Sequence, residues 1–119
     1  MIDLNGHKLN NIKLGVNKDV TLTLTGTAGS YVTQVYVRKG GGSFIIDSEA
    51  NVEFNTIFVE DSARLAVNDG AKATTEQLTV IASVNDDGTT TTSVKLATGM
   101  KLGGLTYHRQ NNSGVLKLG

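Results

Sequence analysis

Two histidines and two short motifs in this chain contain residue types that could do chemistry. The two histidines, His7 and His108, could bind a metal, but they stand near opposite ends of the 119-residue sequence, and we expect exposed or structural roles for both. Asp86–Gly88 offers oxygen ligands of the kind that calcium prefers, yet it lacks the alternating ligands and final glutamate of an EF-hand, so we interpret it as a turn. Gly40–Gly42 could surround a phosphate, but no Gly-Lys-Ser/Thr follows, and we interpret it as a corner that needs positive φ.

The composition excludes several other kinds of site and partner. The chain has no cysteine, so it has no disulfide, no thiol nucleophile and no Cys-bound zinc. Eleven basic residues balance eleven acidic ones, whereas a nucleic-acid-binding domain usually carries an excess of positive charge. No apolar run approaches the roughly 18 residues of a membrane-spanning helix. We therefore expect no nucleic-acid partner, no membrane partner and no cofactor.

The first residues carry no recognisable export signal. A secretory signal has a basic region followed by roughly 7–15 apolar residues. Met1–Gly6 instead leads directly into alternating polar and apolar positions. We expect synthesis in the cytosol, followed by residence there or by assembly into a particle.

Alternation of apolar and polar residues runs along most of the chain and predicts an all-β protein. Val20–Thr25 places three aliphatic residues on one face and three threonines on the other, as in a half-buried strand. Turn-forming segments such as Asn68–Gly70 and Asn111–Gly114 separate the strand-like runs. No window shows a convincing helical period.

The apolar positions repeat with a period of roughly 21 residues, which predicts a parallel β-helix. One column runs through Leu14, Val35, Ile57 and Leu78, and a second column runs through Leu24, Ile45 and Ala66. A solenoid needs such columns, because each coil must place equivalent side chains above those of the previous coil. We expect about five coils, each with three short strands. A β-sandwich is the alternative, although it gives no reason for this period.

The domain organisation follows from the same period. Residues 1–119 are expected to form one β-solenoid domain, with a loop insertion near residues 85–92 where the period breaks. Allowing for this insertion brings Leu78 into line with Leu105.

The segment Asp3–Leu9, with the sequence DLNGHKL, resembles the opening of right-handed β-helices of the pectate-lyase, autotransporter-passenger and phage-tailspike type. The resemblance covers the fold and implies that Asp3 and Asn5 shape the first turn. Similar lyases hold calcium with acidic clusters and use a basic residue to abstract a proton. The corresponding residue types in this chain are the carboxylates Asp47, Glu49, Glu53, Glu60, Asp61 and Asp69, and the bases Arg38, Lys39 and Arg64. We interpret them as charges at solvated turns and assign no catalytic, metal-binding or cofactor-binding residue.

The resulting functional expectation is a non-enzymatic structural or assembly protein. The most favoured setting is a phage virion, as a head decoration or tail-spike-type module made in the host cytoplasm. The alternative is a surface adhesin, or a carbohydrate-binding fragment of a secreted β-helix protein, located outside the cell or on its surface. A polysaccharide lyase ranks third, because so few coils seldom provide its long groove. Ice binding ranks lower still, because the threonine row of residues 21, 23 and 25 is not repeated in the other coils.

The partners expected are copies of the same chain, other virion proteins and a surface glycan. The first and last coils of a β-helix expose unpaired backbone, which favours association. Resemblance to phage spikes makes a trimer the first expectation. Aromatic residues are enriched in interfaces, and the candidate interface residues are Tyr31, Tyr36, Phe44, Phe58 and Tyr107.

Overall fold

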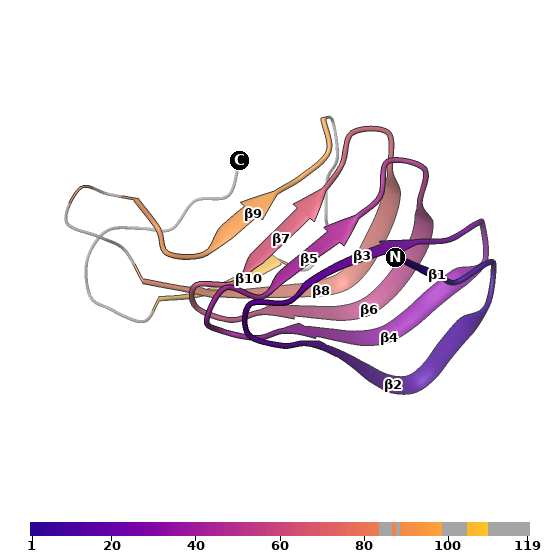
Figure 1. The fold of residues 1–119 in the computed structure, drawn as a ribbon. Helices are drawn as coiled ribbons and strands as arrows, with labels where there is room; N and C mark the ends of the chain where they lie inside the picture. The colour runs from indigo at the N-terminus through magenta and orange to yellow at the C-terminus, as the bar shows by residue number, and fades with distance from the viewer. Residues whose placement is uncertain (84–86, 88, 99–104, 110–119) are drawn as a thin grey trace.

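The fold is a parallel β-solenoid built from two five-stranded sheets (Figure 1). The structure, a computed structural model, describes residues 1–83, 87 and 89–98, together with the backbone of residues 105–109. One sheet contains the short strands β1 (Ile2–Asp3), β3 (Thr21–Thr25), β5 (Ser43–Ile46), β7 (Arg64–Val67) and β9 (Ser93–Lys95). The other contains the long strands β2 (Lys8–Val16), β4 (Ser30–Val37), β6 (Asn51–Val59) and β8 (Lys72–Ala82), and also β10 (Leu105–Arg109).

The all-β solenoid predicted from the sequence is confirmed, but with fewer coils. Every strand pairs in parallel with the strand of the next coil. Because four intervals separate the five strands of each sheet, the chain makes about 4 turns rather than five. The step from Leu65 in β7 to its partner Val94 in β9 is also longer along the chain than the earlier steps, because the predicted insertion lies within it.

Each coil contains two strands instead of the three that we expected. Two consecutive residues of β4, Thr33 and Gln34, both face outward, and Asn55 and Thr56 do the same in β6. Two outward residues in succession interrupt the strict alternation of a flat strand. The long strands bend visibly (Figure 1). Two of the three short strands expected in each coil are therefore the two arms of one long, bent strand.

The ladder of the long strands confirms the first predicted column. Leu14 pairs with Val35, Val35 with Ile57, and Ile57 with Leu78. Leu78 then pairs with Leu105, as expected once the insertion before β9 is taken into account.

The second predicted column is wrong by one residue. Leu24 pairs with Ile46 rather than Ile45, because the step from β3 to β5 is one residue longer than the step from β5 to β7. Ile45 does pair with Ala66, but both side chains face outward and are half-buried. A shift of one residue moves a side chain to the other face of a strand. The inner wall of this sheet therefore contains Leu24, Ile46 and Val67.

The core contains mainly aliphatic residues and two phenylalanines. Phe44 is fully buried and meets Phe54 edge to face, with ring centroids 6.1 Å apart and planes at 88°. Such edge-to-face contacts are favourable for aromatic pairs. The expectation that Phe44 faces a partner is therefore wrong, because its ring fills the interior between the two sheets.

The opening segment forms the first turn, as the resemblance implies. The Asp3 carboxylate accepts a hydrogen bond from the Asn5 N–H at 2.9 Å, and Asn5 and Gly6 both have positive φ. The Gly6 N–H donates to the Ser30 hydroxyl of the next coil at 2.8 Å. The motif thus joins the first coil to the second.

Candidate functional site

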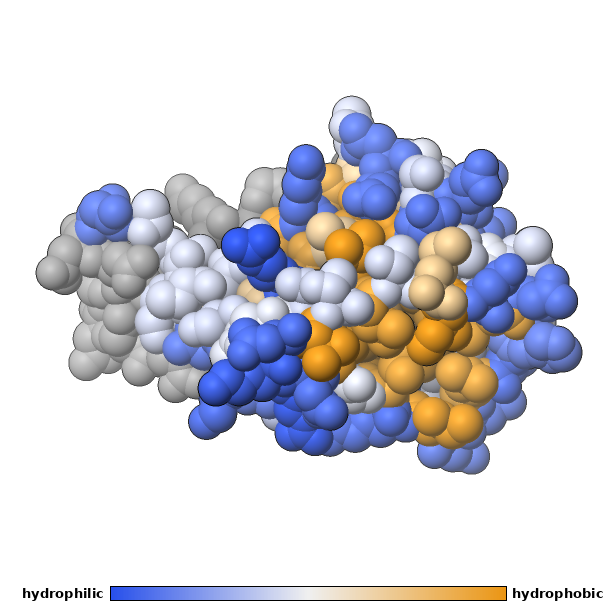
Figure 2. All heavy atoms as spheres, viewed as in Figure 1, coloured by the Kyte–Doolittle hydropathy of each residue, from blue (hydrophilic) through white to orange (hydrophobic). Residues whose placement is uncertain are grey.

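The first coil exposes the end of the hydrophobic core. Ile2 is in register with the fully buried Leu24, yet 37% of Ile2 is exposed because no coil of the described structure lies beneath it. Val20, which precedes β3, is 46% exposed. Leu9 and Leu14 pair with the buried Val32 and Val35 but remain only half-buried themselves. Figure 2 shows hydrophobic residues gathered over the end where β1, β2 and β3 lie.

The backbone of this end is less available for pairing than its side chains. β1 has only two residues, and β2 has an irregular register between Leu9 and Lys13, where Asn11 has a φ of 58°. The Asn11 N–H donates to the Thr33 hydroxyl at 2.9 Å, so it is not free to pair with another strand. Short, irregular edge strands that carry lysines resist the addition of a further strand. The apolar side chains of the first coil are therefore its most accessible binding feature, and we name them the apolar end face: Ile2, Leu9, Leu14, Val20 and Leu22.

The predicted interface aromatics do not form one surface. Tyr36 and Phe58 stack at 4.6 Å between ring centroids, with planes at 11°, on the outer face of the long-strand sheet. Tyr31 is half-buried near the start of β4, whereas Tyr36 lies near its end. Phe44 belongs to the core, and the side chain of Tyr107 lies outside the described part of the chain.

Both faces of the Tyr36 ring are covered. Phe58 lies against one face, and the Lys13 Nζ and the Arg38 Cζ lie 4.2 Å and 4.6 Å from the ring centroid. Cations over an aromatic ring are attracted by its negative face. This arrangement stabilises the stack of coils but offers no open ring face on Tyr36 to a sugar.

A hollow of about 860 Å³ lies beside this stack. Its lining includes Asn17, Lys18, Tyr36, Arg38, Lys39 and Glu60. An Arg38 guanidinium nitrogen lies 4.0 Å from a carboxylate oxygen of Glu60. Burial raises the pKa of the Tyr36 hydroxyl, and its hydrogen bond to the Glu60 carboxylate raises it further. Three cations, Lys18, Arg38 and Lys39, thus lie in the lining of the hollow. We name it the Tyr36 hollow.

Asp61 joins the turn after β6 to the segment that precedes β9. Its carboxylate accepts hydrogen bonds from the Ser83 hydroxyl at 2.9 Å, the Ser83 N–H at 3.1 Å and the Thr91 hydroxyl. Burial opposes the charged form, but these hydrogen bonds outweigh it and hold the pKa of Asp61 below its usual value. Asp61 is therefore a structural anchor, a role that the sequence did not reveal.

The end of the predicted 85–92 insertion is attached to the body of the protein. Thr92 is buried, and its hydroxyl donates to the Ile81 carbonyl at 2.6 Å and accepts from the Ser62 N–H at 3.1 Å. Residues 84–86 and 88 lie outside the described part of the chain. Thr92 therefore belongs to the packed structure, and the exposed Thr91 is tied to it through Asp61.

The other candidate chemical residues are dispersed. His7 belongs to the first turn, where its backbone N–H donates to the Leu4 carbonyl at 2.9 Å. The side chain of His108 lies outside the described residues. Asp87 accepts from the Thr89 N–H at 3.0 Å, whereas Asp86 and Gly88 are not described. In the described residues, no three His, Asp or Glu side chains lie close enough together to hold a metal ion.

The glycine corner with positive φ is confirmed at Gly40 and Gly41 but not at Gly42. Gly40 and Gly41 have φ angles of 89° and 91°, in the region where glycine has no steric penalty. A Cβ at position 40 would lie 2.8 Å from the Cγ of Lys18, so the corner also allows Lys18 to lie against it.

Similarity to known proteins assigns no family to this chain. It matches no protein-family model, no curated protein and no solved structure. Across the described part of the chain, no helix is long and apolar enough to cross a membrane.

Proposed function

We propose that this protein is a non-enzymatic structural module that assembles through its apolar end face. The observation that carries the proposal is the exposure of Ile2, although its register partner Leu24 is fully buried; Val20, just before β3, is exposed as well. Covering apolar surface is favourable by roughly 25 cal/mol per Å². A partner that closes this end extends the core by one more layer.

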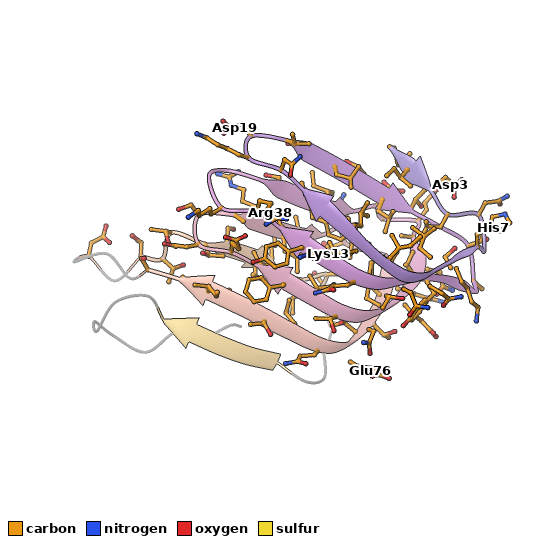
Figure 3. The ribbon with its side chains drawn as sticks, turned by 90° about the horizontal axis from the view of Figure 1, so that it is seen from below. Asp3, His7, Lys13, Asp19, Arg38 and Glu76 are labelled. Carbon is orange, nitrogen blue, oxygen red and sulfur yellow. The ribbon has the colours of Figure 1, made fainter. Side chains whose placement is uncertain are left out.

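The occupant that fits this face is a second copy of the chain. Each end of the first coil carries an acid and a base: Asp3 and Lys8 at one end, Lys18 and Asp19 at the other. Figure 3 shows Asp3 and Asp19 far apart, near the two ends of the first coil. Two copies can meet end face to end face about a two-fold axis in two ways. If like ends meet, Asp3 of one copy can approach Lys8 of the other; if unlike ends meet, Asp3 of one copy can approach Lys18 of the other. The face is thus self-complementary in charge, as a two-fold contact requires.

The setting that we propose is a phage virion, in which the module serves as a head decoration or as part of a tail spike. The solenoid and the resemblance of Asp3–Leu9 to tailspike openings support this setting. A surface adhesin or glycan-binding fragment is the second candidate, but the covered faces of the Tyr36 ring do not favour sugar stacking. A trimer, which the same resemblance predicts, requires a side-by-side contact instead of the end-to-end one.

Sedimentation velocity at micromolar concentration tests the proposal. The wild type should sediment as a dimer that dissociates on dilution. The double variant Ile2→Lys/Val20→Lys should sediment as a monomer, because it places two charges in the apolar contact. Thr74→Lys adds a charge at an exposed position of β8 and should remain dimeric.

Circular dichroism must show the same β-sheet signal for all three proteins. A wild-type monomer at every concentration would overturn the proposed self-association. A wild-type trimer, or a dimer that persists in the double variant, would show that another surface makes the contact.

A further inference from the structure

We propose that the Tyr36 hollow is a binding site for a compact anion with two or more negative charges. The hollow shares Lys18 with the charged edge of the apolar end face, but most of its lining follows β4 and β6, outside the first coil. Three successive coils form it: Asn17 and Lys18 follow β2, Arg38 and Lys39 follow β4, and Glu60 follows β6. Arg38 and Lys13 lie near the middle of the view in Figure 3, between the ends marked by Asp19 and His7.

The charges at the hollow favour an anion. Lys18, Arg38 and Lys39 contribute three positive charges to its lining. Among the described residues, Arg38–Glu60 is the only ion pair within 4.0 Å, so neither lysine is neutralised in this way. Of the two carboxylates there, Glu60 faces Arg38 and accepts from Tyr36, and Asp61 is occupied by Ser83 and Thr91. The lining thus carries three cations and two carboxylates, and the two lysines provide positive potential that an anionic ligand can neutralise.

Arg38 and Lys18 are held in place before a ligand arrives. Arg38 lies over the Tyr36 ring, 4.6 Å from its centroid. Lys18 lies against the corner at Gly40, where a Cβ would come within 2.8 Å of its Cγ. Lys13 lies over the same ring as Arg38, so a fourth positive charge stands close by. Binding costs less when the groups that contact the ligand are already ordered.

The size and the neutral groups of the hollow define the ligand class. A volume of about 860 Å³ is within the usual range of small-molecule sites. The Asn17 amide and the Ser62 hydroxyl, which also line it, can hydrogen-bond to oxygen atoms of a ligand. Arginine binds the two oxygens of a carboxylate or phosphate at once, and lysine acts on either as a point charge. The shared chemistry is therefore that of a multivalent oxyanion, from a polycarboxylate or from a phosphate.

Isothermal titration calorimetry on the full chain tests the site, with citrate and inorganic phosphate titrated separately. The wild type should bind at least one of these anions. Lys18→Gln/Lys39→Gln removes two positive charges from the lining and should weaken binding about tenfold or more. Lys8→Gln/Lys72→Gln removes the same charge from the starts of β2 and β8 and should bind like the wild type.

Each outcome has a defined meaning. Binding of citrate alone identifies a polycarboxylate site, binding of phosphate alone identifies a phosphate site, and binding of both identifies a general oxyanion site. No binding of either anion, or equal weakening in the two double variants, would overturn the proposal. Repeating the titration on Ile2→Lys/Val20→Lys separates this site from self-association, because the monomeric variant retains the hollow and should bind as well as the wild type.

Discussion

The carboxylate of Asp61 accepts a hydrogen bond from the hydroxyl of Ser83 at 2.9 Å, although the two residues lie in different coils. Ser83 follows β8, and Asp61 lies in the turn after β6, so the contact joins two successive coils on the outside of the ladder. The hydroxyl of Thr91 donates to the same carboxylate. One acidic side chain thus fixes both ends of the segment between β8 and β9.

Replacing Asp61 should destabilise the protein in a way that depends on pH. Asp61→Asn removes an acceptor of several hydrogen bonds, and we expect a loss of about 1–3 kcal/mol near pH 7. Burial raises the pKa of Asp61, but the hydrogen bonds from Thr91 and Ser83 lower it more, to below its ordinary 3.8. The stabilisation is therefore present above about pH 4 and is lost as the pH falls through the lower pKa of the folded state.

Thermal unfolding between about pH 3 and pH 7 measures this effect. The difference in midpoint between wild type and Asp61→Asn should shrink as the pH falls below about 4. Glu53→Gln removes an exposed carboxylate of β6 and provides the control, with little change at any pH. A constant difference across the pH range would show that the charge of Asp61 is not what stabilises the contact.

Two neighbouring isoleucines of β5 should respond oppositely to the same substitution. Ile46 is fully buried, whereas Ile45 faces outward and is half-buried. Ile46→Asp should prevent folding, because an unpaired buried carboxylate costs several kcal/mol. Ile45→Asp should give a soluble protein with a cooperative unfolding transition. Soluble expression and thermal unfolding of both variants test the register of β5. A folded Ile46→Asp protein together with an unfolded Ile45→Asp protein would show that Ile45, and not Ile46, faces the core.

Two glycines should also respond differently to a methyl group. A Cβ at Gly42 would lie 2.8 Å from the Arg38 carbonyl oxygen and 3.1 Å from that of Asn17, and neither backbone atom can move aside easily. Gly42→Ala should therefore cost about 1–3 kcal/mol. Gly15 has no neighbouring atom within 4 Å of its Cβ position. Gly15→Ala should be neutral or stabilise by up to about 1 kcal/mol, because alanine restricts the unfolded chain. Urea unfolding of both variants checks the contrast; equal losses would contradict it.

The stacked pair Tyr36 and Phe58 should show coupled contributions to stability. A double-mutant cycle with Tyr36→Ala and Phe58→Ala should give a coupling free energy of about 0.5–1.5 kcal/mol, as expected for stacked rings. The matched cycle with Tyr31→Ala and Phe58→Ala should be additive, because Tyr31 pairs with Glu53 near the other end of the bent strands. Urea unfolding supplies the four free energies of each cycle. Additivity in the first cycle would show that the rings do not interact.

The sequence alone was sufficient for the class of fold and for the column of the long strands. Leu14, Val35, Ile57 and Leu78 repeat because every coil must place an apolar residue at the same inward position. The glycine corner and the first turn were also predictable, because positive φ and local hydrogen bonds depend on neighbouring residues. These features depend on periodicity or on short segments, which a sequence displays directly.

Only the tertiary structure decided the register of the short strands and the presence of one bent strand where two short ones were expected. It also decided the two candidate sites, the apolar end face and the Tyr36 hollow. The steps from β3 to β5 and from β5 to β7 differ in length by a single residue, and that residue decides whether Ile45 or Ile46 is buried. The Tyr36 hollow combines residues from three coils, and Asp61 meets Ser83 and Thr91 across the ladder. The apolar end face exists because Ile2 is in register with the buried Leu24 and no coil of the described structure covers it. Exposure depends on what lies above and below a residue, which is a property of the stacked coils and not of the alternation within one strand.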